Sequence, residues 1–461
     1  MIMKKINNPV RFWCMMLFIV LFYGCETFLE EKPSKDLVIA STIADLQALM
    51  DAGNKLNLGN YPGLLEARTD DVYIGPGGLN RLTVYDQNIY LFDDDYQEDG
   101  ESILMSWFYT YSTIAIANTV MDELSFVKEG TSIERDIIQG TALFHRALGH
   151  FLLAQVFCDV YEESSADQKL GIPLKKTSDT SEPTVRSTIH ETYDFIEKDL
   201  LEALELLPEN TTYLTRPNKA AAHALLARFY LSKSDFENSL FQSEKALEYN
   251  ADLIDFNELN SASSFPIAAM NKETLFFAYS FGIGFLHHSR ECYIDSVLYG
   301  QYDDQDIRKK VYFRALANGK FSFKGTYMGF GSGSFFVGPT TSEMYLTSAE
   351  CYVRKGEPER ARETINTLLK YRWERDYIYM IEEEDPQRLL DIILMERRKE
   401  LIHRGVRWTD IRRLNLDARY RKDIVRKVER DDNIYTLPAN SSGFIYKIPR
   451  VVINFSGIVQ N

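Results

Sequence analysis

The chain has 461 residues, with 52 Lys and Arg against 67 Asp and Glu, for a formal net charge of −15. Nucleic-acid binding comes largely from Lys and Arg neutralising phosphates, so this charge argues against a nucleic-acid partner and equally against adhesion to an anionic membrane surface. The length is enough for a large core, and two subdomains would be ordinary.

The N-terminus has the pattern of a processed leader. Lys4, Lys5 and Arg11 precede a twelve-residue apolar run at 12–23, and no acidic residue occurs before it. A membrane-spanning helix needs about 20 apolar residues, so we predict a signal peptide at residues 1–24 rather than a membrane span. Its removal leaves 49 Lys and Arg against 67 Asp and Glu, a charge of −18.

The end of this leader resembles the lipobox of bacterial lipoproteins, in which a small residue precedes a cysteine that is acylated after cleavage. Gly24 and Cys25 match that pattern, with Leu21 upstream. The resemblance implies lipidation at Cys25 and a lipid-anchored tether at residues 25–40, so that the protein contacts the membrane through its N-terminal lipid only.

The cysteines and histidines give no metal pattern. Cys158, Cys292 and Cys351 are odd in number and scattered, so we expect small buried residues rather than a disulfide framework or a zinc site. The histidines of "LHHS" (286–289) would point to opposite faces of an extended segment, and "YDDQD" (302–306) lacks the twelve-residue calcium loop. We predict no cofactor and no metal ligands, and leave calcium binding open.

In chain order, the first helix is predicted in "STIADLQALMDAG", with Ser41 as its N-cap and Gly53 as its C-cap. Residues 54–100 are rich in Gly, Asn, Asp and Tyr and predict irregular structure with loops. Helical periodicity returns across 103–161, a polar loop follows at 162–186, and another helix comes after it.

Two later segments, 221–250 and 342–372, share the layout of the tetratricopeptide repeat: a small residue, an aromatic residue three positions later, a tight polar turn and a second amphipathic helix. The small residue lets paired helices approach closely, and the aromatic residue fills the groove between them. Such a hairpin cannot bury its apolar face alone, so we expect other helices to stack on it. The matching positions are Ala227, Tyr230 and the turn 233–235 in the first segment, and Ala349, Tyr352 and the turn 355–357 in the second.

Residues 251–341 separate these two segments and lose helical periodicity. They carry many aromatic residues together with Gly and Ser, as in "FSFKGTYMGFGSGSFF" (321–336). Insertions of this length in a helical scaffold tend to be functional. We therefore predict that this second irregular region contributes to a binding site.

The stretch "MERRKELIHRGVRWTDIRRL" (395–414) resembles the late helix of the SusD/RagB family, lipid-anchored outer-membrane proteins of Bacteroidetes nutrient uptake. The tether "CETFLEEKPS", the segments 107–118 and 216–231, and the ending "YKIPRVVINFSGIVQN" resemble other family marks in the same order. Arg404 departs from the family, which usually has an acidic residue before the glycine. The matching positions are Glu396, Arg397, Arg398, Glu400, Leu401, Gly405, Arg407, Trp408, Asp410 and Arg413.

The resemblance implies a mainly α fold: tetratricopeptide-like helical pairs in a SusD-like superhelical scaffold, with long irregular loops and a few short strands forming the ligand-facing part. It also implies a cell-surface lipoprotein of the outer membrane that captures oligosaccharides as the lid of a SusC-like TonB-dependent transporter in polysaccharide uptake, without catalysing a reaction. Residues 41–250 would form an N-terminal region and residues 251–461 a C-terminal region, which includes the insertion 251–341 and the helical pair 342–372.

The acids and arginines at 396–413 could be mistaken for a catalytic cluster. Asp385 and Pro386 are typical of a helix start and Gly405 of a helix end, and the apolar residues between them give the helix a buried side. Charges on such a helix usually form a structural network, so we predict a structural role for them.

Aromatic residues are the candidate ligand contacts. Sugar rings have apolar C–H faces that stack on aromatic side chains, while their hydroxyls need polar partners, and tyrosine meets both demands. Tyrosine is also intermediate in burial, so packing is the competing role for each residue. The predicted contacts are Tyr73, Arg81 and Tyr85 in the first irregular region, and Tyr279, Tyr293, Tyr302 and Tyr327 in the second.

Three alternatives stay open. A peptide-capturing lid like RagB is neither favoured nor disfavoured by the acidic surface. A surface glycan-active enzyme would need two carboxylates about 5–10 Å apart, a spacing that the sequence does not reveal. A tetratricopeptide adaptor inside the cell conflicts with the leader and the lipobox.

Overall fold

Helices dominate the part of the chain that the structure describes. The computed structural model describes residues 40–93, 100–280, 286, 291–331, 334–428 and 433–461. The predicted signal peptide, Cys25, nearly all of the tether, and His287 and His288 lie outside these residues. Within the described residues, no helix is long and apolar enough to cross a membrane.

The mainly α fold predicted from the sequence is confirmed. The longer helices are α2 (Ile43–Met50), α7 (Glu101–Leu124), α8 (Ser132–Phe157), α9 (Ile189–Leu206), α10 (Lys219–Ser232), α11 (Phe236–Tyr249), α14 (Thr341–Arg354), α15 (Pro358–Leu369), α16 (Pro386–Glu400) and α17 (Arg407–Leu414). The short helices are α3 (Gly53–Leu56), α4 (Leu64–Ala67), α5 (Pro76–Leu79), α6 (Val84–Tyr90), α12 (Ser296–Tyr299), α13 (Arg308–Tyr312) and α18 (Arg450–Ser456).

The strands have two to four residues each. They are β1 (Leu58–Tyr61), β2 (Val72–Ile74), β3 (Leu170–Pro173), β4 (Arg186–Thr188), β5 (Tyr279–Ser280), β6 (Cys292–Ile294), β7 (Phe313–Ala315), β8 (Phe321–Phe323), β9 (Phe335–Phe336), β10 (Ile424–Lys427) and β11 (Ile434–Leu437).

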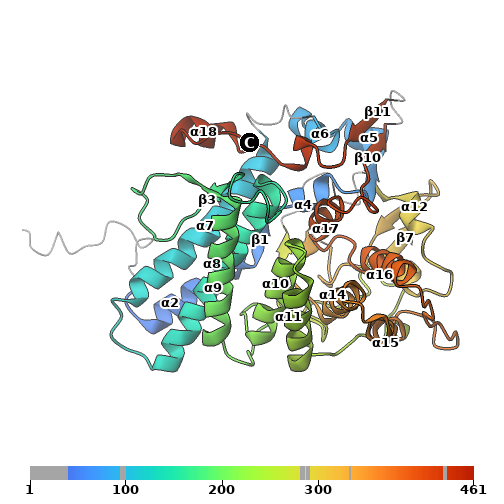
Figure 1. The fold of residues 1–461 in the computed structure, drawn as a ribbon, viewed down its shortest axis with the longest axis horizontal. Coiled ribbons are helices and arrows are strands. Elements are labelled where there is room, and N and C mark those ends of the chain that lie inside the picture. Colours follow the sequence, from blue (N-terminus) through green and yellow to red (C-terminus); the bar gives the residue numbers. More distant parts are fainter. Residues whose placement is uncertain (1–39, 94–99, 281–285, 287–290, 332–333, 429–432) are drawn as a thin grey trace, which may run out of the picture. The chain divides into compact units, whose positions relative to one another are not determined.

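The long helices pack against their neighbours in the sequence. Figure 1 shows α8, α9, α10 and α11 side by side, and α14 joins this row by packing on α11. Helices α15 and α16 then pack on α14. Each helix thus covers the apolar side of the one before it, which is how stacked hairpins bury a continuous core.

The predicted tetratricopeptide-like pairs are α10 with α11 and α14 with α15, and their turns have the same geometry. In each turn, one residue adopts a left-handed backbone: Ser234 at φ 59° and Gly356 at φ 82°. The N–H of the residue after it donates to the carbonyl of the tyrosine of that helical pair. The small residue three positions before the tyrosine, Ala227 or Ala349, is fully buried. These bonds are Asp235 N to Tyr230 O at 3.0 Å and Glu357 N to Tyr352 O at 2.9 Å.

The first helix begins one residue later than predicted. Thr42, not Ser41, is its N-cap: the Thr42 hydroxyl accepts from the N–H of Asp45, whose carboxylate in turn accepts from the N–H of Thr42. The helix ends at a cap on Asp51, and Gly53 opens the short helix α3 instead of closing α2. The reciprocal bonding of a capping box fixes the start, and the Asp at the third helical position was the signal for it.

The two irregular regions join each other. Strand β1 runs parallel to β5, which also pairs with β9, and β2 pairs antiparallel with β6. Strands β7 and β8 form a hairpin beside β6. The described parts of 54–100 and 251–341 therefore build one body of short elements, within the compact unit Thr42–Asn461.

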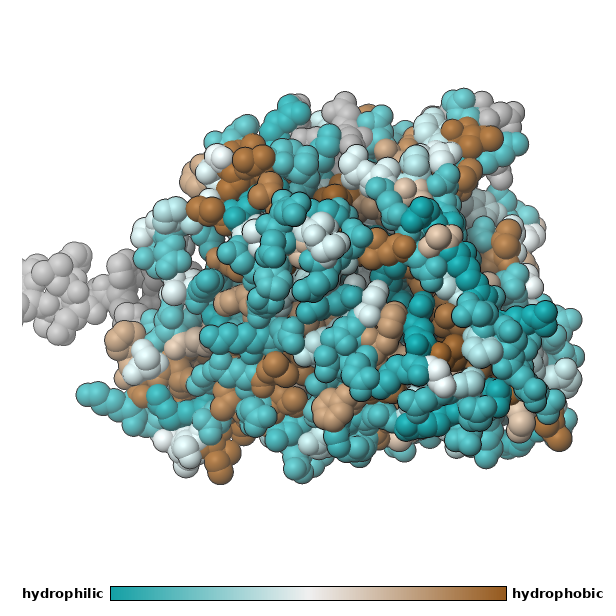
Figure 2. Space-filling view, viewed as in Figure 1, coloured by the Kyte–Doolittle hydropathy of each residue, from teal (hydrophilic) through white to brown (hydrophobic). Residues whose placement is uncertain are grey.

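The face of the molecule in Figure 2 is largely hydrophilic, with scattered hydrophobic side chains. Exposed apolar residues that are scattered singly are normal for a folded protein. One cluster lies over α18, where Val451 and Phe455 are exposed.

We predict that Gly356→Ala lowers the free energy of unfolding by about 1 kcal/mol, because a side chain in the left-handed region costs about 1–2 kcal/mol. A Cβ at Gly356 meets no atom within 4 Å, so the cost comes from the backbone alone. Gly53→Ala is the matched control, since Gly53 lies in a helix and a Cβ there is 3.7 Å from its nearest neighbour. Urea unfolding with equal midpoints for the two variants would contradict this account.

Candidate functional site

A pair of tyrosines spans the strands β2 and β6. Tyr73 and Tyr293 are directly opposite each other in the antiparallel register, and their ring centroids are 5.4 Å apart with the ring planes tilted by 50°. Tyr73 is half-buried, and Tyr293 is largely buried beneath it. We call Tyr73 and Tyr293 the tyrosine pair.

The turn of the β7–β8 hairpin reaches over the tyrosine pair. The Nζ atom of Lys320 lies 5.2 Å from the ring centroid of Tyr73 and 4.7 Å from that of Tyr293, within the range of a cation–π contact. Asn318 Nδ2 donates a hydrogen bond to the Tyr293 hydroxyl at 3.1 Å. The two rings therefore share a border of amine and amide groups.

Lys320 and Asn318 were not predicted from the sequence, although a signal was present. Asn318-Gly319 between the alternating segments "FRA" and "FSF" is typical of a β-hairpin turn, and Gly319 does adopt φ 77°. This local signal predicts an exposed turn at residues 316–320. It does not predict that the turn lies over Tyr73 and Tyr293, because those residues are distant in the sequence.

Arg81 and Glu291 form an ion pair at the edge of this site. Arg81 Nη2 lies 3.1 Å from Glu291 Oε1, and about half of the Arg81 side chain is exposed. The glycines of α5 make room for this acid, because a Cβ on Gly77 would lie 2.4 Å from the Glu291 carboxylate. The structure thus brings together three predicted contacts, which are Tyr73, Arg81 and Tyr293.

Of the other four predicted contacts, two are partly buried and two are buried. Tyr85 and Tyr279 are partly buried and pack against the main core. Tyr302 and Tyr327 are buried, and their hydroxyls donate to the Lys399 carbonyl at 2.7 Å and to Glu273 Oε2 at 2.6 Å. Neither ring has surface for a ligand, so we correct the prediction by removing Tyr302 and Tyr327 from the candidate site.

The opposite face of β2 and β6 lines a small pocket. Successive side chains of a strand point to opposite faces, so Val72 and Cys292 line this pocket while Tyr73 and Tyr293 face away from it. Its volume is about 40 Å³, which suits one or two water molecules or a single polar group rather than a sugar ring. The other lining residues include Phe265, Ile294, Phe323, Lys324, Thr326, Phe330 and Phe335.

Four polar side chains line this pocket among its apolar residues: Lys324, Thr326, Ser334 and His403. Lys324 Nζ donates to the backbone carbonyls of Ser261 and Ser263, and burial lowers the pKa of Lys324. Thr326 Oγ1 is buried and has no hydrogen-bond partner within the described part of the chain. The pocket can therefore accept a hydroxyl group or a water molecule behind the strands that carry the tyrosine pair.

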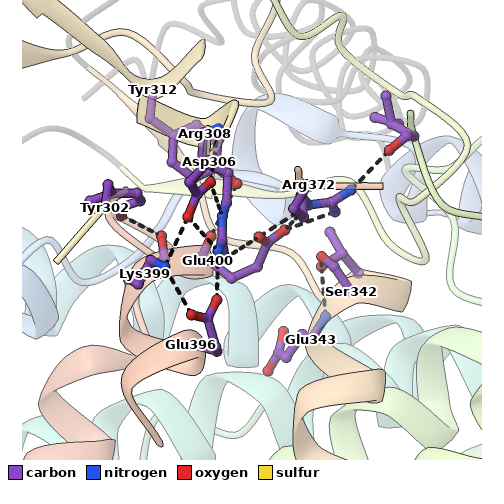
Figure 3. A network of polar contacts seen from close by, with 12 residues as sticks. Tyr302, Asp306, Arg308, Tyr312, Ser342, Glu343, Arg372, Glu396, Lys399 and Glu400 are labelled. Carbon is purple, nitrogen blue, oxygen red and sulfur yellow. Dashed lines mark hydrogen bonds and ion pairs between the residues drawn. The ribbon is translucent and has the colours of Figure 1, made fainter. Parts of the chain in front are cut away.

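A buried network of ion pairs lies where α13, α16 and the end of α15 meet (Figure 3). Arg308 and Arg372 both contact Glu400, at 3.2 Å and 2.8 Å. Lys399 Nζ lies 2.8 Å from both Asp306 and Glu396, which Arg308 also contacts. Burial by itself would raise the pKa of Glu400, but the surrounding guanidinium groups, led by that of Arg372, outweigh burial and lower it.

Arg404, the departure from the family pattern, adds a further cation near this network. Glu273 also belongs to the buried network, because it lies 2.7 Å from Arg372. The network without Arg404 thus has three cations, Arg308, Arg372 and Lys399, and four carboxylates, Asp306, Glu273, Glu396 and Glu400. The Arg404 guanidinium stacks on the Tyr327 ring at 3.6 Å and brings a fourth positive charge. Its contact is an aromatic face, and its terminal nitrogens have no hydrogen-bond partner among the described residues.

Arginines of the same stretch hold the start of β2. Arg407 contacts the two carboxylate oxygens of Asp70 at 2.7 and 2.9 Å, and Arg398 contacts Asp71 at 2.8 Å. The Asp71 carbonyl in turn accepts from the N–H of Asp295, directly after β6. These bonds fix residues that adjoin Tyr73 and Tyr293 on both strands.

The rest of the stretch contacts the helical scaffold. Arg413 contacts Glu350 on α14 through two bonds, at 2.6 and 2.7 Å, and Asp410 joins Arg413 to Arg397. Trp408 is fully buried and stacks on Phe444, and Gly405 N donates to Glu66 at 2.7 Å. The charges of this stretch are thus used in contacts between elements.

No group of three or more His, Cys, Asp or Glu is placed to hold a metal ion in the described ranges. Cys158, Cys292 and Cys351 are buried free thiols, as expected from their scattered spacing.

Two family descriptions match this chain. Residues 27–231 match proteins described as starch-binding and associating with the outer membrane, and residues 341–446 match the SusD family. A curated relative, the SusD-like protein P2 of Formosa agariphila, is 28% identical over 265 residues. This alignment covers 54% of the chain and spans about half of the relative, 47% of its length.

Solved structures share the fold. A SusD superfamily protein from Bacteroides thetaiotaomicron is 22% identical, with a TM-score of 0.74 over 91% of this chain and 99% of that one. A SusD-like carbohydrate binding protein from Bacteroides vulgatus is 20% identical, with a TM-score of 0.71 over 90% of this chain and 97% of that one. At these identities the likeness establishes the fold.

We predict that Glu400→Gln lowers the free energy of unfolding by about 3 kcal/mol, because removal of one partner leaves buried guanidinium groups without their counter-charge. Glu374→Gln is the control, since its ion pair with Lys310 is exposed and is worth less than about 1 kcal/mol. Urea unfolding of both variants measures the difference, and equal losses would contradict a central role for the buried network.

Stability is expected to fall in acid as Glu350 becomes protonated. Burial alone would raise the pKa of Glu350, but the Arg413 guanidinium outweighs it and lowers the pKa to about 2, from an ordinary 4.5. A pKa lowered by folding stabilises the protein above about pH 4.5, and that stability is lost as the pH falls toward 2. Urea unfolding from pH 6 to 2 is expected to show a shallower loss in Glu350→Gln than in the parent chain. Parallel curves would contradict the assignment.

Proposed function

We propose that this chain, which belongs to the SusD/RagB family, captures oligosaccharides at the cell surface for nutrient uptake. The observation that carries the proposal is the tyrosine pair with its polar border. Tyrosine rings offer apolar faces to sugar C–H groups, while Lys320, Asn318 and the Arg81–Glu291 pair offer donors and acceptors to sugar hydroxyls.

The Lys320 ammonium covers the rings in the present arrangement. Lysine has a long, flexible side chain, so we propose that a sugar takes the place of the ammonium over the rings while the amine moves to a hydroxyl or carboxylate of the ligand. The small pocket behind the strands, with Thr326 Oγ1 and Lys324, would supply polar contacts for an ordered water or a hydroxyl.

The finer part of the proposal concerns the assembly. We infer that leader removal exposes Cys25, that acylation of this residue anchors the chain in the outer membrane, and that the protein acts as a lid on a SusC-like TonB-dependent transporter. The family description of association with the outer membrane supports this assembly. An anchor of one N-terminal lipidated residue leaves the helical scaffold free to move over a transporter.

We propose no catalytic step. Glycoside hydrolysis needs an acid and a second carboxylate across the scissile bond. Glu291, a carboxylate beside the tyrosine pair, is paired with Arg81, an arrangement that favours binding over proton transfer. The acids and arginines of the stretch 396–413 are engaged in contacts between elements. His403 of the same stretch lines the small pocket behind the strands.

We predict that Tyr73→Ala weakens glycan binding about tenfold, because it removes the more exposed ring of the pair. Tyr293→Phe keeps the ring and loses only the hydroxyl that accepts from Asn318, so a smaller loss is expected. Tyr213→Ala is the control, since Tyr213 is 59% exposed and belongs to neither irregular region. Calorimetry of the mature chain against neutral and anionic oligosaccharides and against peptides measures all three variants.

Three results would overturn the proposal. Binding of peptides alone would favour a RagB-like lid, and glycan binding that is unchanged in Tyr73→Ala would exclude the tyrosine pair. Turnover of a bound glycan would favour an enzyme instead.

A further inference from the structure

A second group of aromatic rings lies between α15 and α16. Trp373 stacks on Tyr379 with ring centroids 3.7 Å apart and planes within 7°, and on Tyr377 at 5.5 Å and 18°. Trp373 is buried, whereas Tyr377 is 45% exposed. Ile378 and Met380 beside it are 92% and 60% exposed. We call residues 377–380 the aromatic strip.

Hydrogen bonds hold the chain on both sides of the aromatic strip. Before it, the N–H of Glu374 donates to the Gln305 carbonyl at 3.0 Å, and Asn257 Nδ2 donates to the Trp373 carbonyl at 3.1 Å. After it, Asn366 binds the N–H and the carbonyl of Ile381 at 2.8 and 3.0 Å. A surface that is already ordered loses little entropy when it binds a ligand.

The groups around the aromatic strip are acidic. Asp376, Glu382 and Glu384 are exposed carboxylates on either side of it. Three neighbouring cations are paired: Lys310 with Glu374 and Arg375 with Asp255, each at 2.6 Å, and Arg362 with Glu359 at 3.5 Å. Carboxylates accept hydrogen bonds from sugar hydroxyls and repel anionic chains, so this surface favours a neutral ligand rich in hydroxyl groups.

The extent of the aromatic strip also favours a sugar chain over a protein. A stable protein interface buries about 800 Å² on each partner, whereas the exposed apolar residues here are three neighbours along one loop, followed directly by the acidic run 382–385. Two or three sugar rings would cover such a strip, with their C–H faces on Tyr377 and Ile378 and their hydroxyls on the flanking carboxylates.

We propose that the aromatic strip is a second carbohydrate-contact surface, which binds neutral glycan chains and is separate from the tyrosine pair. The inference rests on the proposed function. Two surfaces on one chain raise the affinity for a long polysaccharide by avidity, because the second contact forms at a high effective concentration once the first is made.

The test is affinity gel electrophoresis of the mature chain in gels that contain starch, xylan, mixed-linkage β-glucan or, as the anionic probe, polygalacturonate. Tyr377→Ala is expected to weaken retention by the neutral polysaccharide that the parent binds by about five- to tenfold, and Tyr377→Phe to preserve it. Tyr73→Ala and the double variant Tyr73→Ala/Tyr377→Ala complete the set, and the double variant is expected to be retained least. Because Tyr377 is an exposed loop residue, unchanged urea unfolding is expected for its variants.

The outcomes separate the two proposals. Retention of Tyr377→Ala equal to that of the parent, with Tyr73→Ala weakened, would overturn the aromatic strip as a carbohydrate surface and leave the proposed function intact. Retention of the parent by polygalacturonate alone would overturn the neutral specificity. A parent chain that is retained by no glycan would overturn the proposed function together with this inference.

Discussion

The ion pairs made by α16 and α17 are the constraint on which the candidate site depends. Burial of charged groups is unfavourable unless each finds a partner, so the arginines and acids of 396–413 specify which elements lie beside them. Arg398 and Arg407 hold Asp70 and Asp71 at the start of β2, and Glu400 holds Arg308 at the start of α13. Helix α13 leads directly into β7. Helix α16 therefore positions Tyr73 through Arg398, and through Glu400 it positions the hairpin that carries Lys320.

This arrangement explains how irregular segments far apart in the sequence form one binding surface. Each strand of the body has two to four residues, which is too short for independent stability. The helical scaffold stabilises these strands, because α14 and α16 make buried contacts with the segments that flank them. Thr341 of α14 contacts Asp252 and Glu273, and α16 contacts Asp71 and Arg308. Arg404 is likewise a buried charge that is stabilised by its neighbours. Its charge stands beside a network in which carboxylates outnumber cations, and the Tyr327 ring serves as its contact.

The sequence predicted the helical scaffold well because its signals are local. The turns at Ser234 and Gly356, the paired small and aromatic residues, and the charged stretch all lie within short windows. Pairing of β2 with β6 has no local signal, since it depends on segments that meet only after the scaffold forms. Tyr293 and Tyr302 are equivalent by sequence, yet one lies in the tyrosine pair and the other inside the core. Burial of a single tyrosine is decided by its tertiary neighbours, and a pattern of residue types does not contain them.

The central claim is that glycans bind where the α16–α17 ion pairs hold β2, β6 and the β7–β8 hairpin together. Hydrogen–deuterium exchange of the mature chain with and without a saturating oligosaccharide tests it most directly. We expect slower exchange at residues 72–75, 291–294 and 316–321 when the ligand is bound. Saturable binding that leaves exchange in all three segments unchanged would contradict it.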